Sequence, residues 1–271
     1  MEKIYMRNAL KLLAGLMLVL FLGNCSKDSE PNPDPDPIDR SANLLATGES
    51  AEDLLANANF DELVIQIAYV EGFRPSDLAL GDLREFLQLR TFKEVIRFEY
   101  LPLPSPDEET LTLQEIASLE NENRTLYNDG RTLALYIYFA DAPSSTDDPD
   151  GNTFTLGAVY RNTSMVLHES TIRLLASKSA LISTAAAEAA TLTHEFGHLF
   201  GLVDLGTPEI NPHEDPDASN HCLEDGCLMQ ASLEFTTGLM KAMEERAAKN
   251  LTIVPDLGPE CIRDLQGAGG R

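Results

Sequence analysis

The sequence has no tryptophan and few basic residues, since 20 Lys and Arg stand against 44 Asp and Glu in 271 residues. The formal net charge is therefore -24 at pH 7. So acidic a surface repels phosphate backbones, which argues against nucleic acid as a partner. With 43% hydrophobic residues, 17 Gly and 15 Pro, the composition also excludes a collagen-like chain, a wholly disordered chain and a membrane protein with several spans.

A long hydrophobic run is absent from the amino terminus, where the apolar stretch from Leu12 to Leu22 has 11 residues. That stretch is too short to span a bilayer, but behind basic residues it has the form of a secretion signal over residues 1–24. The string Leu22-Gly23-Asn24-Cys25 resembles the lipoprotein cleavage box of bacteria, in which the cysteine becomes the lipidated first residue. The alternative is an ordinary signal peptide cut nearby, with Cys25 as a bystander.

Residues 25–40 are rich in Pro and Asp and have little apolar surface to bury, so we expect an extended tether. The lipoprotein resemblance implies a protein held by Cys25 in the outer membrane of a Gram-negative cell envelope, facing the periplasm or the exterior. Residues 41–271 are enough for one domain with a core of its own, and we expect a monomer.

Cysteine is scarce, with four in the whole chain. If Cys25 is lipidated, Cys222, Cys227 and Cys261 remain, and three thiols cannot all pair with one another. Export exposes them to oxidation, which favours a short-loop disulfide between Cys222 and Cys227 over a metal site.

Strand and helix patterns alternate through the first half of the expected domain, which predicts a mixed α+β fold. Strands are expected at Leu63–Val70, Val95–Leu101, Thr132–Ala140, Thr155–Tyr160 and Ser164–Glu169. Helices are expected from Ser76 to about Arg90, from Thr112 to about Arg124 with a Thr112–Glu115 capping box, from Ser183 onward, and from Phe235 to Asn250. In the acidic loop, Asp148, Asp150 and Asn152 could bind calcium, although solvated loop acids are commoner.

The helical segment after Ser183 carries the residues with the clearest chemistry. His194 and His198 are four residues apart, so both imidazoles project from one helix face and can hold one zinc ion. Glu195 follows the first histidine, where its carboxylate can take a proton from water at the metal. Gly201 permits the helix to stop and the chain to turn back. The alternative is a solvated helix face with two unrelated histidines, but four of the five histidines lie between residues 194 and 221.

These residues carry a resemblance to a known family. The string HEFGHLFGL resembles the zinc helix of the metzincin clan of metallopeptidases, whose pattern is His-Glu-x-x-His-x-x-Gly-x-x-His or Asp followed by a Met-containing turn. The string HCLEDGCLM, from His221 to Met229, resembles the archaemetzincin segment in which the third zinc histidine precedes Cys, four residues, Cys, one residue and Met. The resemblance implies that Met229 packs beneath the zinc without binding it.

The third zinc ligand stays open at this point. Asp204, three residues after Gly201, holds the third-ligand position of the pattern, as in snapalysin-like enzymes, whereas His221 lies 17 residues further on within the archaemetzincin-like segment. We favour His221, with Asp204 and His213 as alternatives. The second, four-cysteine zinc site of archaemetzincins lacks its downstream Cys-x-x-Cys here, because Cys261 stands alone.

The resemblance implies a zincin or metzincin-like fold, with a mixed twisted sheet, an active-site helix, and a small lower subdomain of residues 202–271 below an upper one of residues 41–201. It also implies a zinc metalloendopeptidase in which Glu195 is the general base, and a protein or peptide substrate lying along an edge strand within Thr155 to Glu169. Two other functions stay open: a non-catalytic zinc-binding surface lipoprotein, and a zinc hydrolase of a non-peptide amide. His168, the remaining histidine, is expected to be a structural or surface residue.

Overall fold

The structure, a computed structural model, describes residues 39–148, 150, 153–231 and 236–271. The predicted signal segment, Cys25 and most of the tether lie outside these residues, so lipidation stays a prediction. In the part of the chain that is described, no helix combines the length and the apolar character needed to cross a membrane.

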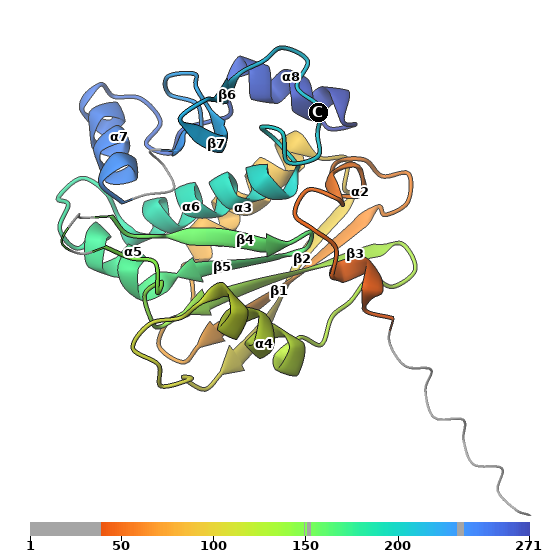
Figure 1. Cartoon of the computed structure of the whole chain (residues 1–271), viewed down its shortest axis with the longest axis horizontal. Helices are drawn as coiled ribbons and strands as arrows, with labels where there is room; N and C mark the ends of the chain where they lie inside the picture. The colour runs from red at the N-terminus through yellow and green to blue at the C-terminus, as the bar shows by residue number, and fades with distance from the viewer. Residues whose placement is uncertain (1–38, 149, 151–152, 232–235) are drawn as a thin grey trace, which may run out of the picture. The chain divides into compact units, whose positions relative to one another are not determined.

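A five-stranded sheet forms the centre of the fold (Figure 1). Its strands are β1 (Glu62–Val70), β2 (Val95–Leu103), β3 (Thr132–Ala140), β4 (Gly157–Arg161) and β5 (Ser164–His168), in the order β2-β1-β3-β5-β4. The pairs β1–β2, β1–β3 and β3–β5 are parallel, with β1 and β3 in register from Glu62 opposite Thr132 to Tyr69 opposite Phe139. Only β4 is antiparallel, and it lies at the edge. The prediction of a mixed sheet is confirmed, although the mostly parallel pairing gives the fold more α/β character than the expected α+β class.

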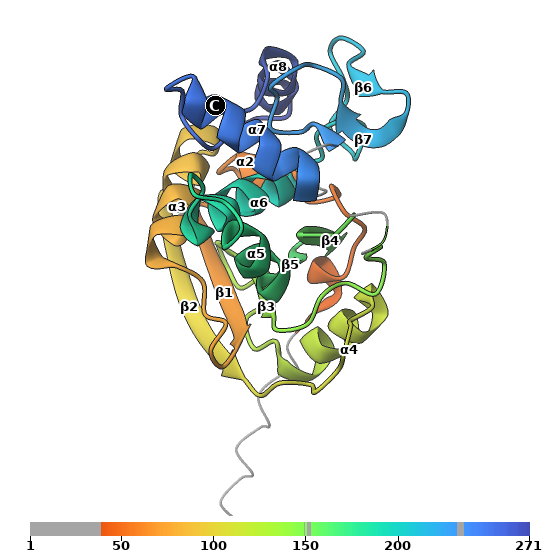
Figure 2. The ribbon, with the colours of Figure 1, turned by 90° about the vertical axis from the view of Figure 1, so that its left-hand side faces the viewer.

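Helices cover both faces of the sheet (Figure 2). This agrees with the central strand β3, in which apolar residues are buried on both faces. Successive side chains of a strand point to opposite sides. On one side, Leu133, Leu135 and Ile137 share a core with α3 (Asp77–Arg90) and α6 (Thr184–Leu199). On the other side, Tyr136 and Tyr138 pack in a smaller core with α4 (Leu113–Asn123). The result is three layers, with α6 lying across the larger core.

The helix starts follow local capping rules. The Ser76 hydroxyl accepts from Leu78 N–H at the start of α3, and Ser183 accepts from Ala186 N–H at the start of α6. The predicted capping box is confirmed, because Thr112 and Glu115 exchange both hydrogen bonds. The sequence pattern did not predict four short helices, namely η1 (Ser41–Asn43), α2 (Ala51–Leu55), α5 (Glu169–Ala176) and α8 (Pro259–Gly267).

Beyond α6 the chain forms short elements: β6 (Glu214–Asp215), β7 (Ala218–Cys222), α7 (Thr236–Ala248) and α8. Gly201, with φ at +71°, makes the turn that leads into them. The larger apolar core continues into this part through Met229, Met243 and Leu265. The predicted boundary at residues 201 and 202 therefore marks a change of secondary structure within one continuous core.

Two buried carboxylates join α5 to α6 near the start of both helices. Glu169 and Glu188 are 0% and 1% exposed. Glu188 accepts from Ser76 N–H at 2.9 Å, and Glu169 accepts from Arg173 Nε at 2.6 Å. Burial and the adjacent Glu188 carboxylate raise the pKa of Glu169 from 4.5 to about 9. The pair therefore shares one proton at neutral pH.

The free energy of unfolding should fall as pH rises toward 9. A carboxyl whose folded-state pKa is raised stabilises the fold fully below its ordinary pKa, and this stabilisation is lost as pH rises through the folded value, here about 9. We expect a slope of at most about 1.4 kcal/mol per pH unit, the value for one proton. Denaturant titrations from pH 7 to 9.5 measure it. Glu169→Gln keeps an acceptor for Arg173 but cannot ionise, so it should flatten the slope, and an unchanged slope in that variant would contradict the assignment.

Candidate metal centres

Three imidazoles meet at the carboxyl end of α6. His194 and His198 come from α6 and His221 from β7, and one ring nitrogen of each lies within 4.8 Å of the other two. We call these residues the histidine centre. The Nε2 atoms of His194 and His198 are 3.2 Å apart. Two nitrogens bound to one tetrahedral zinc at about 2.0–2.1 Å lie roughly 3.3 Å from each other, so the spacing suits a shared zinc ion.

Backbone carbonyls orient two of the three rings. His194 Nδ1 lies 2.7 Å from the Leu228 carbonyl oxygen, and His221 Nδ1 lies 2.9 Å from that of Ser219. An Nδ1–H donated to a carbonyl leaves the Nε2 lone pair available to a metal. Burial, with His194 and His221 close by, holds the pKa of His198 well below its ordinary value. Neutral imidazole is the form that binds metal, so the donor set fits zinc.

The structure separates the three alternatives for the third position. His221 lies with His194 and His198, whereas Asp204 is exposed and belongs to no group of metal-ligating His, Cys, Asp or Glu side chains among the described residues. His213 lies in a second group. The chain leaves α6 after Leu199 and returns through the β6–β7 hairpin, which brings His221 back to the helix.

Glu195 lies beside the histidine centre and the edge strand. It is 1% exposed and lines a cleft of about 380 Å³ together with His198, His221, Ala158 and Val159. A Cβ atom added at Gly157 would lie 2.8 Å from Glu195 Oε1. Glycine at the start of β4 therefore permits the strand to approach this carboxylate closely.

Met229 packs against α6 between the two helical histidines. Its side chain is fully buried, and a Cβ atom added at Gly197 would lie 2.1 Å from Met229 Sδ. Any side chain at position 197 would thus displace Met229. Met229 therefore contacts α6 beside the histidine centre, and its support of a bound zinc stays a prediction.

A second group gathers three cysteines and a histidine, here called the thiol centre: His213, Cys222, Cys227 and Cys261. Ligand atoms of His213, Cys222 and Cys261 lie within 4.8 Å of one another. The Cys227 and Cys261 Sγ atoms are 3.6 Å apart, and Cys261 Sγ is 3.4 Å from His213 Nε2. All four residues are at most 2% exposed. Sulfurs at about 2.3 Å from one tetrahedral zinc lie roughly 3.8 Å apart, which is close to the spacing here.

The predicted disulfide between Cys222 and Cys227 is not formed. All three described cysteines are free thiols, and Cys261, which the sequence left alone, lies in contact with Cys227. The spacing in the sequence favoured a pair between the two cysteines that are closest in the chain, whereas α8 carries Cys261 into the group from 34 residues away. Nothing in the sequence indicated that His213 joins the cysteines, since it was considered only as an alternative third ligand beside His194 and His198. A histidine near a cysteine pair is compatible with a mixed Cys and His zinc site.

Polar contacts favour one thiolate in the thiol centre. The neighbouring thiols of Cys222 and Cys261 lower the pKa of Cys227 to about 3, helped by the backbone N–H groups of Met229 and Gly258. Their Sγ contacts are 3.4 Å and 3.1 Å long. The hydrogen bond with Cys227 raises the pKa of Cys222 to about 12, and the hydrogen bonds with Cys222 and Cys227 raise the pKa of Cys261. Thiolate is the ligand form of cysteine, so Cys227 is prepared for a metal.

The remaining predicted residues lie elsewhere. His168 is 1% exposed, and its Nδ1 is 2.9 Å from the Ala142 carbonyl oxygen. Of the suggested calcium ligands, Asn152 is outside the described residues, and no metal-ligating group found among the described residues includes Asp148 or Asp150.

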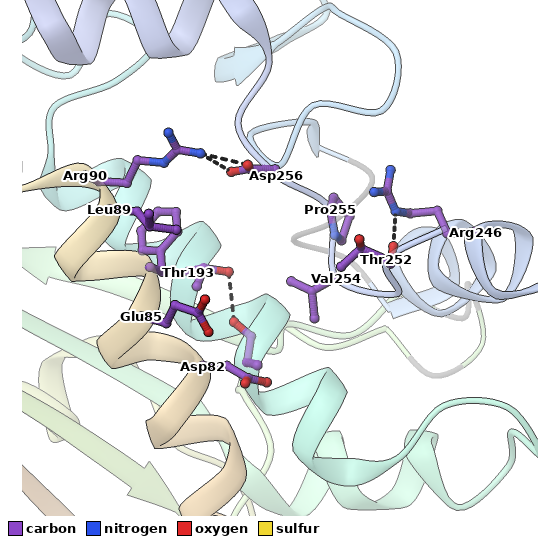
Figure 3. A pocket seen from close by; sticks show the side chains of 12 residues that line it. Asp82, Glu85, Leu89, Arg90, Thr193, Arg246, Thr252, Val254, Pro255 and Asp256 are labelled. Atoms are coloured by element: carbon purple, nitrogen blue, oxygen red, sulfur yellow. Dashed lines mark hydrogen bonds and ion pairs between the residues drawn. The ribbon is translucent and has the colours of Figure 1, made fainter. Parts of the chain in front are cut away.

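A further cavity of about 360 Å³ lies on another face of α6 (Figure 3). Asp82 and Glu85 of α3 and Thr193 of α6 line one wall, and residues 252 and 254–256 line the other. Thr193 donates to the Ala189 carbonyl, and Arg90 is paired with Asp256 at 2.7 Å. No histidine is among the residues that line this cavity.

Comparisons with known proteins find similar chains among solved structures. No family model and no curated protein matches the chain. Among solved structures, archaemetzincin from Methanopyrus kandleri is similar, with a TM-score of 0.45 and 14% sequence identity. The match covers 77% of this chain and 96% of that one. The function proposed below therefore rests on the geometry of the two side-chain groups.

Proposed function

We propose that the protein is a zinc-dependent endopeptidase whose histidine centre holds the catalytic ion. The observation that carries the proposal is the convergence of His194, His198 and His221 beside the buried carboxylate of Glu195, in a cleft bordered by the edge strand β4. Three protein ligands leave one position open for a reactant, as catalytic zinc sites require.

Each part of the cleft has a role in peptide hydrolysis. When bound, zinc supplies a Lewis acid that polarises a carbonyl and makes water more acidic. Glu195 takes the proton of the attacking water and delivers it to the leaving nitrogen. β4 ends the sheet, so its outer backbone edge can hydrogen-bond an extended peptide. Leu113 and Leu205 also line the cleft and favour apolar side chains on that peptide.

The thiol centre is proposed to hold a second, structural zinc. Its three sulfurs and one imidazole are buried. The ligand atoms of His213, Cys222 and Cys261 lie within 4.8 Å of one another, and Cys227 Sγ is 3.6 Å from Cys261 Sγ. Cysteine and histidine are the usual ligands of structural zinc sites. Such a site contributes to folding rather than to turnover. The anchor through lipidated Cys25 in the outer membrane is likewise a proposal, which the cleavage box and the acidic tether support.

Cleavage of an unbiased peptide library by the purified full chain tests the proposal. We expect internal cleavage that a chelator abolishes and added zinc restores. Cleavage of non-peptide amides alone would favour a different hydrolase. Tight zinc binding at the histidine centre with no hydrolysis of either class would favour a non-catalytic surface lipoprotein.

A further inference from the structure

The segment from His221 to Met229 belongs to both centres at once. His221 is part of the histidine centre, whereas the next residue, Cys222, and then Cys227 belong to the thiol centre. The carbonyl of Leu228 returns to the histidine centre and accepts from His194 Nδ1 at 2.7 Å. Along this nine-residue segment, successive residues thus contact first one and then the other of two buried groups of potential metal ligands.

The thiols hold the backbone of this segment in place. Cys227 Sγ accepts from Met229 N–H at 3.4 Å, and Cys222 Sγ accepts from Glu224 N–H at 3.4 Å. The segment is closed by Cys222 N–H, which donates to the Met229 carbonyl at 2.7 Å. The position of the Leu228 carbonyl, and with it the orientation of His194, therefore depends on where Cys222 and Cys227 lie.

The other two members of the thiol centre tie this segment to distant parts of the chain. His213 precedes the β6–β7 hairpin, and Cys261 lies in α8. The Sγ–Sγ contact of 3.6 Å and the Sγ–Nε2 contact of 3.4 Å that link these residues are weak without a metal. A shared ion would replace them with coordinate bonds and fix the segment against α8.

We infer that the thiol centre positions two catalytic ligands, His194 and His221, so that a metal in the thiol centre strengthens metal binding in the histidine centre. This inference rests on the proposed function of the histidine centre. In it, Cys222 and Cys227 are positioning residues that act through the backbone of residues 221–229. Loss of an outer partner of a metal-bound histidine costs about 10–100-fold in metal affinity, and a comparable effect is expected here.

The test compares Co²⁺ binding in the full chain with that of its His213→Ala variant. Thiolate-to-cobalt absorption in the near ultraviolet reports the thiol centre, and visible ligand-field bands report the nitrogen-bound ion. His213→Ala should weaken Co²⁺ binding in the thiol centre, so that the thiolate signal appears only at higher Co²⁺ concentration, and should weaken Co²⁺ binding in the histidine centre by about 10–100-fold. His213→Cys, which offers a fourth thiolate, should restore both affinities. Leu223→Ala is the matched control, because Leu223 is exposed in the same segment.

A second measurement uses the unaltered protein, so the result does not depend on whether a variant folds. One equivalent of Cd²⁺, which prefers sulfur ligands, is added to the metal-free chain, and Co²⁺ is then titrated into the histidine centre. Coupling between sites is reciprocal, so prior Cd²⁺ binding should raise the Co²⁺ affinity by about tenfold or more. An unchanged affinity in both experiments overturns the inference but leaves the proposed function intact. Absence of Co²⁺ from the histidine centre of the unaltered protein overturns both.

Discussion

Replacing Glu195 with Gln is expected to lower kcat for peptide cleavage by about 10²–10⁴-fold, the usual contribution of a general acid–base group. Gln has nearly the same size as Glu and therefore fits in the space beside Gly157. That space is narrow, because a Cβ atom added at Gly157 would lie 2.8 Å from Glu195 Oε1. Its amide cannot take a proton from water. The three imidazoles are unaltered, so zinc content should equal that of the unaltered protein.

Zinc content and turnover are measured on the same preparations. Glu85→Gln is the matched control, since Glu85 is an exposed glutamate of α3 and lines only the cavity on the other face of α6. That control should keep full activity. Full activity in Glu195→Gln would show that Glu195 is not the general base. Loss of zinc in that variant would indicate that Glu195 is a zinc ligand instead.

The second large effect is expected for His221→Ala, which removes the only member of the histidine centre that lies outside α6. Loss of a direct ligand should exceed the roughly 10–100-fold cost of losing an outer partner, so zinc affinity should fall more than about 100-fold. Competition with a chromophoric chelator measures the affinity. Activity should fall with occupancy, and excess zinc should restore little of it.

Asp204→Asn is the paired variant, because Asp204 holds the alternative third position in the sequence pattern. Asp204 is exposed, with φ at +64°. Asn tolerates that left-handed backbone conformation well, so the substitution tests the carboxylate without disturbing the turn. We expect unchanged zinc affinity. A large loss in Asp204→Asn, together with retained zinc in His221→Ala, would transfer the third position to Asp204.

The two centres share one stretch of chain, which limits how independently they can vary. Met229 lies under α6 against Gly197, and Leu228 holds His194 through its carbonyl. Cys222 is next to His221 in the chain and Cys227 is next to Leu228, so a change in the thiol centre can alter the cleft through one or two residues of backbone. Variants of Cys222 and Cys227 should consequently be judged by metal affinity at both centres rather than by turnover alone.

Local physics made several features predictable from sequence. Capping by Ser76, Thr112 and Ser183 depends on residues three or fewer positions away, and all three helix starts agree with the structure. The apolar and β-branched character of β1 and β3 identified both strands. The four-residue spacing of His194 and His198 places two imidazoles on one helix face independently of any tertiary contact.

The sequence by itself determined the strand and helix pattern, the helical histidine pair and the neighbouring carboxylate, because each depends on backbone periodicity and contacts within one helical turn. Only the tertiary structure decided that His221, rather than Asp204 or His213, joins that pair. It also decided that Cys261 and His213, 48 residues apart, meet around Cys222 and Cys227 instead of leaving a disulfide. Which of these side chains meet depends on where the loops and α8 return to a common core. Contacts that close tens of residues of chain leave no pattern among neighbouring residues in the sequence.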